Sequence, residues 1–524
     1  MTDYVIAGSG INGLVAAALL ALKGQKVLVL ERNAEIGGCI RTEEATRPGF
    51  MHDVMATTFV LFLLSPAYAA LGPELEKRGL SFAHPEIPTG VLRPDGSHLV
   101  LRRDRVANIA AFEALAQGDG EQYAADMQKL GADAPFLFAL LGGKLWSWRM
   151  AKTIATEAWR RGPRSLSSFF GEALQPARHW LQPCYSSELF QALLAPWVLH
   201  TGLGPESAYS GQMAKVIAFA LEAAGAPVVK GGASNILSAF ARLIRDHGGD
   251  IRTDADVAEV IVDSSGRATG IRLASGEEIA ARKGVICSMT PAQLYGRLLR
   301  NWPGAEGLRS EARRFVHGKG NMQIHYALSS PPKWRREELG KVALLHLTPG
   351  LDGVSKAVNE AERGMLPAEP TICLGQPTAF DPSRAPPGKA ILWLQLPEAP
   401  RHIKGDAAGK IAVPPDGSWT ADVREAYADR VEEALCRHIP DFRSQVLARR
   451  SYSPADLESM NINLVGGDPY GGACSIDQFF LWRPLRDTTN HDSPVKGLYH
   501  IGASTHPGPG LGGGSGFLLA NSLS

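Results

Sequence analysis

The chain has 524 residues, a net charge of +1 and 20% charged residues, an ordinary globular composition for a protein of more than one domain. The near-zero charge gives no indication of a nucleic-acid-binding surface. The six cysteines are scattered without a CxxC pair, so we expect no disulfide framework, metal cluster or redox-active dithiol. There is no HExxH motif, no apolar stretch of about 18 residues and no basic segment before the first apolar run. These features predict a cytoplasmic protein without a metal site or a membrane-spanning helix.

The N-terminal residues follow the order strand, glycine-rich turn, helix, strand and acid. An apolar run at residues 4–7 predicts a strand, residues 14–22 predict a helix, and residues 26–30 predict a second strand that ends on Glu31. This is the arrangement in which a glycine motif indicates a bound dinucleotide. Glu31 would accept hydrogen bonds from a ribose diol.

Each glycine of the turn has a physical role in such a unit. Gly8 allows the chain to turn tightly, Gly10 leaves room for a pyrophosphate, and Gly13 lets the helix approach the strand. Ile11 and Asn12 belong to the same turn and to the predicted cofactor site, and the helix that follows offers free N–H groups and a dipole that favour phosphate. We therefore predict a dinucleotide site at this turn.

The residues after Glu31 favour FAD over NAD. Arg32 is followed by the pair Gly37-Gly38 and by Arg41. This segment resembles FAD-binding proteins of the amine oxidase and phytoene desaturase superfamily, in which the second glycine pair brings the backbone close to FAD. The resemblance implies that Arg32, Gly38 and Arg41 also belong to the cofactor site.

The end of the chain resembles the C-terminal flavin segment of phytoene desaturase-like proteins. A predicted strand at residues 498–501 leads into a loop and then a helical run at residues 517–523. The resemblance implies that the loop lies along the flavin and that a helix N-terminus faces the pyrimidine end of the ring, where its dipole would stabilise the reduced flavin. The loop residues assigned to the cofactor are Gly502, Ala503, Gly510, Gly512 and Gly513.

A third block at residues 228–292 resembles the middle segment of the same superfamily. There a valine backbone meets the adenine, and Val257 stands at the matching position. With residues 1–60 and 450–524, the resemblance covers about 200 residues.

These blocks predict an α/β fold with a Rossmann-type (GR2-like) FAD-binding domain built from discontinuous segments. An α+β substrate domain and a helical cap complete it. We assign residues 1–104, 226–292 and 450–524 to the FAD-binding domain, 105–225 to the cap, and 293–449 to the substrate-domain sheet and helices.

The cap contains an aromatic and aliphatic run at residues 135–150 that is followed by Lys152, Arg160, Arg161 and Arg164. One interpretation is a helix lying in a membrane interface. The other is a cap helix with one buried face and a solvated basic face.

The resemblance implies an FAD-dependent oxidoreductase of the phytoene desaturase type. Hydride would pass from an apolar, isoprenoid or lipid-like substrate to flavin N5, and oxygen or a quinone would reoxidise the flavin. Alternatives are a flavin-dependent saturase or isomerase, an amine oxidase, and a flavin-binding protein without turnover. Oligomeric state is left open.

Three residues are candidates for moving the proton that must leave in a desaturation. His506 lies beside the C-terminal flavin loop, although a purely conformational role in a Pro/Gly loop is also open. His52 and Asp53 follow Gly49-Phe50 in a segment that passes near the flavin in the family. For Asp53 the alternative is a solvated carboxylate at a strand edge.

Overall fold

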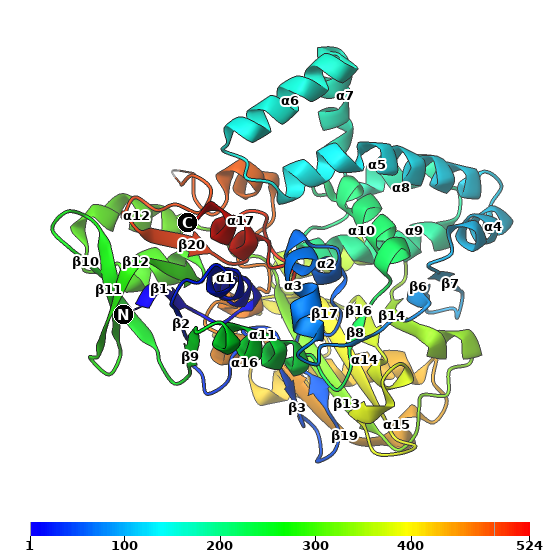
Figure 1. The fold of residues 1–524 in the computed structure, drawn as a ribbon. Coiled ribbons are helices and arrows are strands. Elements are labelled where there is room, and N and C mark those ends of the chain that lie inside the picture. Colours follow the sequence, from blue (N-terminus) through cyan, green and yellow to red (C-terminus); the bar gives the residue numbers. More distant parts are fainter. Residues whose placement is uncertain (1, 487, 524) are drawn as a thin grey trace.

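The computed structural model describes residues 2–486 and 488–523. In these residues the chain builds two large sheets, with helices packed between and around them (Figure 1).

The first sheet has seven strands in the order β10-β11-β12-β1-β2-β9, with β20 also paired to β12. Its strands are β1 (Thr2–Ala7), β2 (Val27–Leu30), β9 (Asp250–Arg252), β10 (Val257–Val262), β11 (Ala268–Leu273), β12 (Glu278–Ser288) and β20 (Leu498–Ile501). The strands β9, β2, β1, β12 and β20 run parallel. The strand β11 pairs antiparallel with the first half of β12, and β10 pairs antiparallel with β11 at the margin of the sheet. All three predicted flavin blocks therefore meet in one sheet.

Four helices share a hydrophobic cluster on one face of this sheet: α1 (Ile11–Leu22), α3 (Pro66–Glu76), α11 (Ser234–Asp246) and α17 (Gly514–Ser522). The helix α1 is buried along almost its whole length, which fits its alanine- and leucine-rich sequence. Gly516 lets α17 approach α1 closely, because a Cβ there would lie 2.0 Å from the carbonyl oxygen of Asn12. The first and last helices of the chain are thus packed side by side.

The second sheet also has seven strands, in the order β19-β13-β17-β16-β14-β6-β7. Its strands are β6 (Ile87–Leu92), β7 (His98–Leu101), β13 (Gly320–Leu328), β14 (Val342–Leu347), β16 (Ile372–Gly375), β17 (Ala390–Ala399) and β19 (Val446–Tyr452). The helix α14 (Ala421–Cys436) packs on one face, and the cap packs on the other.

The predicted domain boundaries at residues 104 and 450 are wrong in detail. The strands β6 and β7 were assigned to the FAD-binding domain, yet β6 pairs in parallel with β14 of the second sheet. The strand β19 crosses the boundary at residue 450 and pairs with β13. An apolar strand pattern shows that a strand forms but not which distant strand it joins.

Residues 105–225 are helical in the structure. The cap helices are α4 (Arg105–Leu115), α5 (Asp119–Gly142), α6 (Trp148–Arg161), α7 (Pro163–Ala173), α8 (Ala177–Cys184), α9 (Glu188–Leu194) and α10 (Ser210–Ala224), with a 3₁₀ turn η1 (Ala195–Thr201). The helices α6 and α7 form a hairpin that projects from the rest of the molecule (Figure 1). In the described part of the chain, no helix combines the length and apolarity needed to cross a bilayer.

The predicted interfacial run at residues 135–150 is not one helix. It spans the end of α5, a break after Gly142 and the start of α6. Phe136, Leu137 and Met150 are buried, whereas Trp146 and Trp148 are exposed. The run therefore does not form the single interfacial helix of the first interpretation, and Lys152, Arg160 and Arg161 belong to the same helix α6 as its last residues.

The remaining elements are short or peripheral. They are β3 (Thr42–Glu43), β4 (His52–Asp53), β5 (Phe82–Ala83), β8 (Val228–Val229), β15 (Met365–Leu366), β18 (Gly405–Asp406), α2 (Val60–Leu63), α12 (Glu306–Arg314), α13 (Leu351–Glu362), α15 (Phe442–Gln445), α16 (Pro454–Met460) and a π-helix η2 (Ala292–Leu298). Of these, β3 and β4 pair with one another beside the flavin blocks.

Candidate flavin and substrate site

The turn after β1 has the geometry of a phosphate cradle. A Cβ on Gly8 would lie 2.7 Å from the carbonyl oxygen of Ser288, and one on Gly13 would lie 2.3 Å from that of Gly8. Both positions are closed by backbone atoms. In contrast, a Cβ on Gly10 would meet no atom within 4 Å. At the start of α1, free space therefore lies next to Gly10, the residue beside which the pyrophosphate was predicted.

Glu31 lies buried at the end of β2 and is held by backbone and hydroxyl donors. Its Oε2 accepts hydrogen bonds from the Ser9 hydroxyl at 2.6 Å and the Ser9 N–H at 3.2 Å, and its Oε1 accepts one from the Asn33 N–H at 3.1 Å. A carboxylate offers about four acceptor positions, so one remains. That capacity fits a ribose hydroxyl.

The second glycine pair lies directly against the first turn. Gly37 donates its N–H to the Ser9 hydroxyl at 3.0 Å, and a Cβ on Gly38 would lie 3.2 Å from the Cα of Gly10. Arg41 forms an ion pair with Glu43 at 2.7 Å, and Arg32 is exposed. Gly38 therefore lies beside the glycine turn, whereas the guanidinium of Arg41 is paired with Glu43.

The C-terminal block reaches the same edge of the first sheet. Gly8, Met289 and Gly502 directly follow the parallel strands β1, β12 and β20. In open α/β sheets, ligands bind outside the carboxyl ends of the strands. Val257 begins β10 near this edge, since the Ala255 N–H donates to the carbonyl oxygen of Glu31 at 2.8 Å.

Asn12 joins the first helix to the last. Its Oδ1 accepts hydrogen bonds from the Ser515 hydroxyl at 2.9 Å and the Gly516 N–H at 3.4 Å. The Ser515 hydroxyl also accepts one from the Gly502 N–H at 2.9 Å. The Asn12 side chain is therefore used in the protein, and its backbone at the first turn of α1 is the part that faces the cradle. Gly513 precedes α17 with a φ of 67°.

Arg483 is a site residue that the sequence analysis missed. It is buried, and its Nη2 donates to the carbonyl oxygens of Tyr470 at 2.6 Å and Ala503 at 2.8 Å. A further bond reaches the carbonyl oxygen of Ala473 at 3.3 Å. Arg483 thus ties the turn at residues 464–474 to the C-terminal flavin loop. Because all its hydrogen-bond partners except the Cys474 sulfur are backbone carbonyls, no sequence motif indicates it.

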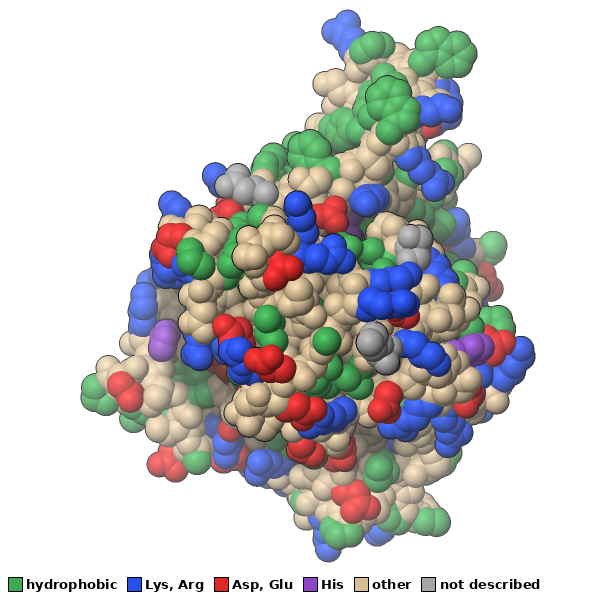
Figure 2. Space-filling model, turned by 60° about the vertical axis from the view of Figure 1, so that its left-hand side comes forward, with side chains coloured by type: hydrophobic (Ala, Val, Ile, Leu, Met, Phe, Trp, Pro, Cys, Tyr) green, Lys and Arg blue, Asp and Glu red, His purple; other side chains and the backbone are tan. Residues whose placement is uncertain are grey.

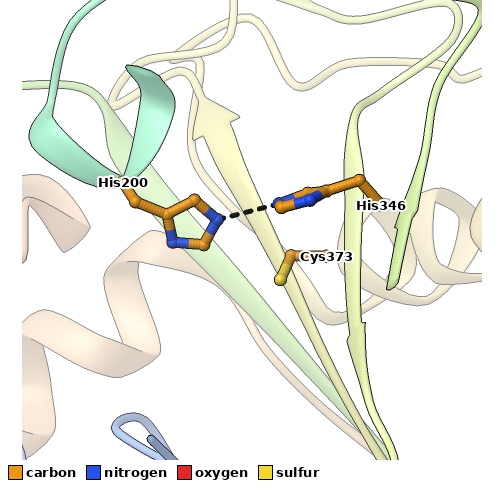
Figure 3. A group of neighbouring side chains, drawn as sticks. All are labelled: His200, His346 and Cys373. Atoms are coloured by element: carbon orange, nitrogen blue, oxygen red, sulfur yellow. Dashed lines mark hydrogen bonds between the residues drawn. The ribbon is translucent and has the colours of Figure 1, made fainter. Parts of the chain in front are cut away.

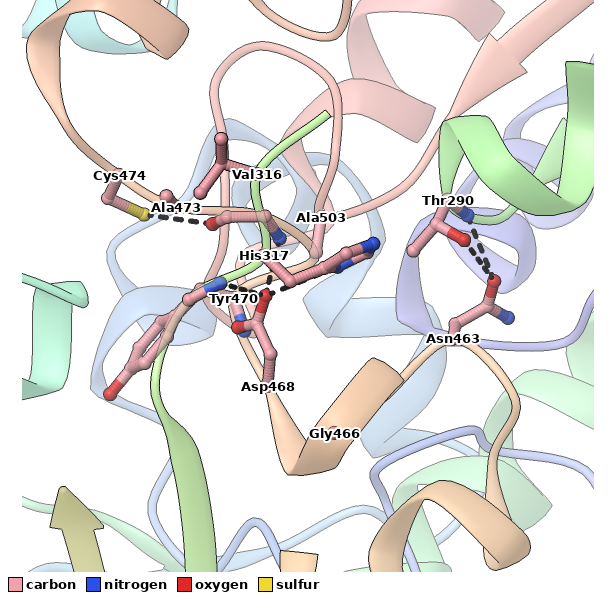
Figure 4. Close-up of polar contacts among 12 residues, drawn as sticks. Thr290, Val316, His317, Asn463, Gly466, Asp468, Tyr470, Ala473, Cys474 and Ala503 are labelled. Carbon is pink, nitrogen blue, oxygen red and sulfur yellow. Dashed lines mark hydrogen bonds and ion pairs between the residues drawn. The ribbon is translucent and has the colours of Figure 1, made fainter. Parts of the chain in front are cut away.

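Asp468 organises the same turn (Figure 4). Its carboxylate accepts hydrogen bonds from the N–H groups of Gly318, Tyr470 and Gly472, each at 2.8 Å, and lies 3.7 Å from the His317 ring. Nearby, the side-chain oxygen of Asn463 accepts hydrogen bonds from the backbone and hydroxyl of Thr290, as Figure 4 shows. These side chains fix the backbone of the turn at residues 464–474 and of the segment that follows β12.

Asp53 lies in a saturated, buried site. Its carboxylate accepts hydrogen bonds from the Thr42 hydroxyl at 2.7 Å and the Ala233 N–H at 2.8 Å. Its other oxygen pairs with Arg384 at 3.0 Å and contacts Thr57 at 3.3 Å. The alternative of a solvated strand edge is wrong. The filled acceptor positions also argue against a role as general base.

His52 and His506 are both buried and neutral. Burial is the main cause that lowers the pKa of His52 to about 2 and that of His506 to about 3. Nε2 of His506 donates to the carbonyl oxygen of Gly143 at 2.9 Å, which leaves Nδ1 as the bare nitrogen. Among the described residues this Nδ1 has no hydrogen-bond partner. The ring of His52 lies 5.2 Å from that of His325 on the second sheet.

The second sheet turns a row of neutral side chains toward the cap. His346 of β14 lies directly opposite Cys373 of β16, and Nε2 of His346 is 2.9 Å from Nε2 of His200 in η1 (Figure 3). Desolvation lowers the pKa of His200 to about 4 and that of His346 well below its usual value. Two nitrogens on one tetrahedral zinc ion lie about 3.4 Å apart, given Zn–N distances of about 2.0–2.1 Å. In this arrangement the imidazoles instead bond to each other.

The face of the second sheet that points toward the cap also contacts the segment around Met55, which belongs to the predicted FAD-binding domain. Trp393 of β17 lies in the cluster shared by the sheet and the cap, and its Nε1 donates to the carbonyl oxygen of Met55 at 3.1 Å. The chain around His52 to Met55 therefore packs against this face of the second sheet.

A family model described as flavin containing amine oxidoreductase matches residues 11–508. The chain belongs to this family. The predicted amine oxidase and phytoene desaturase resemblance is confirmed, and the cofactor is FAD.

The curated relatives span nearly the whole chain. Pyridine nucleotide-disulfide oxidoreductase domain-containing protein 2 of Rattus norvegicus is 30% identical, covering 98% of this chain and 92% of the relative. A limonene dehydrogenase polypeptide of Castellaniella defragrans is 25% identical (99% and 94%). The neurosporene-forming phytoene desaturase of Rhodobacter capsulatus is 24% identical (100% and 94%).

Among solved structures, a redesigned putrescine oxidase superposes with a TM-score of 0.60 at 15% identity, covering 99% of this chain and 98% of that one. At this identity the likeness shows the fold alone. It confirms the predicted α/β FAD-binding fold, and the oxidoreductase class follows from the family.

Proposed function

We propose that this flavoenzyme dehydrogenates an apolar, isoprenoid or lipid-like substrate, with oxygen or a quinone as the final electron acceptor. Bound FAD supplies the chemistry, since its N5 accepts hydride from a substrate C–H bond. The chain binds and orients the substrate and keeps water away.

The observation that carries this proposal is the neutral face of the second sheet. Two cross-strand rows lie on it. The first is Gln323, Gln395, Cys373 and His346, and the second is His325, Trp393, Gly375 and Leu344. None of these eight residues is Asp, Glu, Lys or Arg. The second row continues on β19 with Arg450, an exposed side chain opposite His325 at the margin of the sheet. Burial lowers the pKa of His325 to about 4. An uncharged substrate can lie against such a face, whereas a cationic amine would lose its hydration without a carboxylate partner.

We propose that the cofactor lies along the edge where the three blocks meet. The pyrophosphate would lie over Gly10 at the N-terminus of α1, and Glu31 would bind the ribose. Val257 would meet the adenine. The loop from Gly502 to Gly513 would follow the flavin, whose pyrimidine end would face the N-terminus of α17.

In this proposal the side chains of the site orient the substrate and the flavin loop, and they do not act as ionised acids or bases. Of the predicted proton carriers, His52 and His506 each keep a ring nitrogen without a hydrogen-bond partner among the described residues, and His506 is the one beside the C-terminal loop. Its pKa decides how it can act. With a pKa of about 3, it is a hydrogen-bond acceptor at neutral pH. We therefore propose that His506 orients the loop and that no ionised general base is needed on the sheet face.

The names of the relatives agree with this substrate class. Limonene and phytoene, in the names of two relatives, are hydrocarbons, whereas putrescine, in the name of the structural neighbour, is an amine. A membrane would supply such hydrocarbon substrates, and we propose that the protein works at a membrane surface.

The test is anaerobic mixing of the FAD-loaded protein with a micelle-solubilised isoprenoid hydrocarbon and with an alkyl amine of equal length. We expect the hydrocarbon alone to bleach the flavin absorbance. Bleaching by the amine alone would favour the amine oxidase, and hydrogen transfer from pre-reduced flavin to an alkene would favour the saturase. The absence of any redox reaction would indicate a non-catalytic flavin protein.

A charge placed on the neutral face provides a matched control. Gln395→Glu changes one amide to a carboxylate within the first row, and Gln128→Glu makes the same change on the exposed surface of α5. We expect Gln395→Glu to slow reduction by the hydrocarbon at least about tenfold, since an unpaired carboxylate near an apolar ligand is costly. Equal rates in the two variants would contradict the proposed substrate position.

A further inference from the structure

The helix α6 turns its aromatic side chains toward solvent. Trp148 and Trp159 are 86% and 89% exposed. They are eleven residues apart, about three turns, and so share one face of the helix. A surface helix ordinarily hides its apolar stripe and exposes its polar one. The helix α6 instead exposes large apolar side chains together with its polar ones.

Basic side chains accompany these tryptophans. Residues 144–164 contain six Lys or Arg against the single acid Glu157, in a chain whose net charge is +1. Arg149 and Lys152 are exposed on the side of α6 next to the tryptophan face. Figure 2 shows large hydrophobic side chains beside basic ones on the projecting part of the molecule.

The inner side of the hairpin is well anchored. Arg161 pairs with Glu157 at 2.6 Å and with Asp133 of α5, and its guanidinium lies over the rings of Phe136 and Phe169 at 5.8 and 5.5 Å. The outer face is therefore presented by a packed element rather than by a loose segment.

We propose that this outer face of α6 docks on an anionic phospholipid bilayer. Tryptophans favour the interface between headgroups and acyl chains, and Lys and Arg beside them are attracted to anionic headgroups. The combination of both on one projecting helix fits a lipid surface better than a protein partner, whose interface core would be depleted of Lys. This inference names the surface behind the membrane role in the proposed function and rests on that proposal.

The base of the hairpin is joined to the C-terminal flavin loop. His506 donates to the carbonyl oxygen of Gly143, the residue after α5, at 2.9 Å. The side chain of Asn490 exchanges two hydrogen bonds with the backbone of Trp146 at 3.1 and 2.9 Å. Docking of α6 would therefore hold the flavin loop near the surface from which an apolar substrate comes.

The test is co-sedimentation of the FAD-loaded protein with phosphatidylcholine vesicles, with and without phosphatidylglycerol. We expect binding that needs the anionic lipid and weakens with salt. The variant Trp148→Ser/Trp159→Ser should bind at least about tenfold more weakly, because two large aromatic surfaces are lost. Arg149→Ser/Lys152→Ser should lose about 25-fold, at about fivefold for each basic side chain.

Two matched controls keep the other causes apart. Val106→Ser removes an apolar side chain that is 77% exposed on α4, and Lys389→Ser/Lys410→Ser removes two exposed charges of the substrate domain. Both should bind as the wild type does. Equal binding by the tryptophan variant, equal binding to neutral vesicles, or a solution dimer abolished by the tryptophan change would each overturn the inference.

The result is independent of catalysis. Vesicle binding is measured without substrate, and FAD content and flavin reduction by a micellar hydrocarbon are measured separately on the same variants. Lost vesicle binding with intact flavin reduction supports the docking surface. Wild-type protein that reduces its flavin but does not bind vesicles would overturn the docking surface and the membrane role, and would leave the proposed dehydrogenation standing.

Discussion

The variant Gly10→Ala should weaken FAD binding at the turn after β1 without disturbing the folding of that turn. The added methyl group would meet no protein atom within 4 Å, and the φ of −62° and ψ of 168° at Gly10 suit alanine. Alanine is a poorer N-cap than glycine, by less than about 1 kcal/mol. Alanine also lowers the conformational entropy of the unfolded chain, which stabilises the folded protein by about 0.4–1 kcal/mol. We therefore expect the apo-protein to unfold at nearly the wild-type temperature.

FAD binding should suffer instead. A methyl group forced into a filled site costs about 1–3 kcal/mol, which weakens FAD binding by about 5- to 150-fold. The assay is titration of the apo-protein with FAD, next to thermal unfolding of the same sample.

Gly13→Ala is the contrasting variant, since its Cβ would lie 2.3 Å from a backbone oxygen and should destabilise the apo-protein itself. Wild-type FAD affinity in Gly10→Ala, or an unaffected apo-fold in Gly13→Ala, would refute the reasoning.

Three further predictions concern buried charges and imidazoles. Arg384→Met leaves the carboxylate of Asp53 buried without its counter-charge and should cost about 3–5 kcal/mol in urea unfolding; a loss below about 1 kcal/mol would contradict this. Burial lowers the pKa of His500 to about 4, so the unfolded chain binds more protons below about pH 6.5 and stability falls as pH is lowered from there. At pH 5 this amounts to about 2 kcal/mol, which His500→Gln should remove from the pH dependence of unfolding and exposed His402→Gln should not. Arg483→Met should weaken FAD binding at least about tenfold, because the flavin loop loses its charge-assisted hydrogen bonds; unchanged affinity in the FAD titration would show that the loop is held otherwise.

The turn after β1 could be predicted from the sequence because the residues that shape it are close together in the chain. Gly8, Gly10, Gly13 and Glu31 lie within one short unit, and the structure gives each glycine the space that its predicted role requires. The helix after the C-terminal loop was also predicted, although α17 begins at Gly514 rather than at residue 517.

Long-range partners could not be read from the chain. Asp53 and Arg384 are 331 residues apart, and nothing in either segment indicates the other. His346 and Cys373 face each other only through the register of β14 and β16. Which face of α6 is exposed depends on which side of the helix packs inward, and Arg161 packs inward through its contacts with α5 and α7.

The most direct test of the account is the cofactor released from purified protein, identified by chromatography and quantified against the chain. We predict FAD in stoichiometric amount in the wild type, a large loss in Gly10→Ala, and full retention in Trp148→Ser/Trp159→Ser. A wild-type protein that is colourless and takes up no added FAD would contradict the central claim that the three blocks form an FAD site.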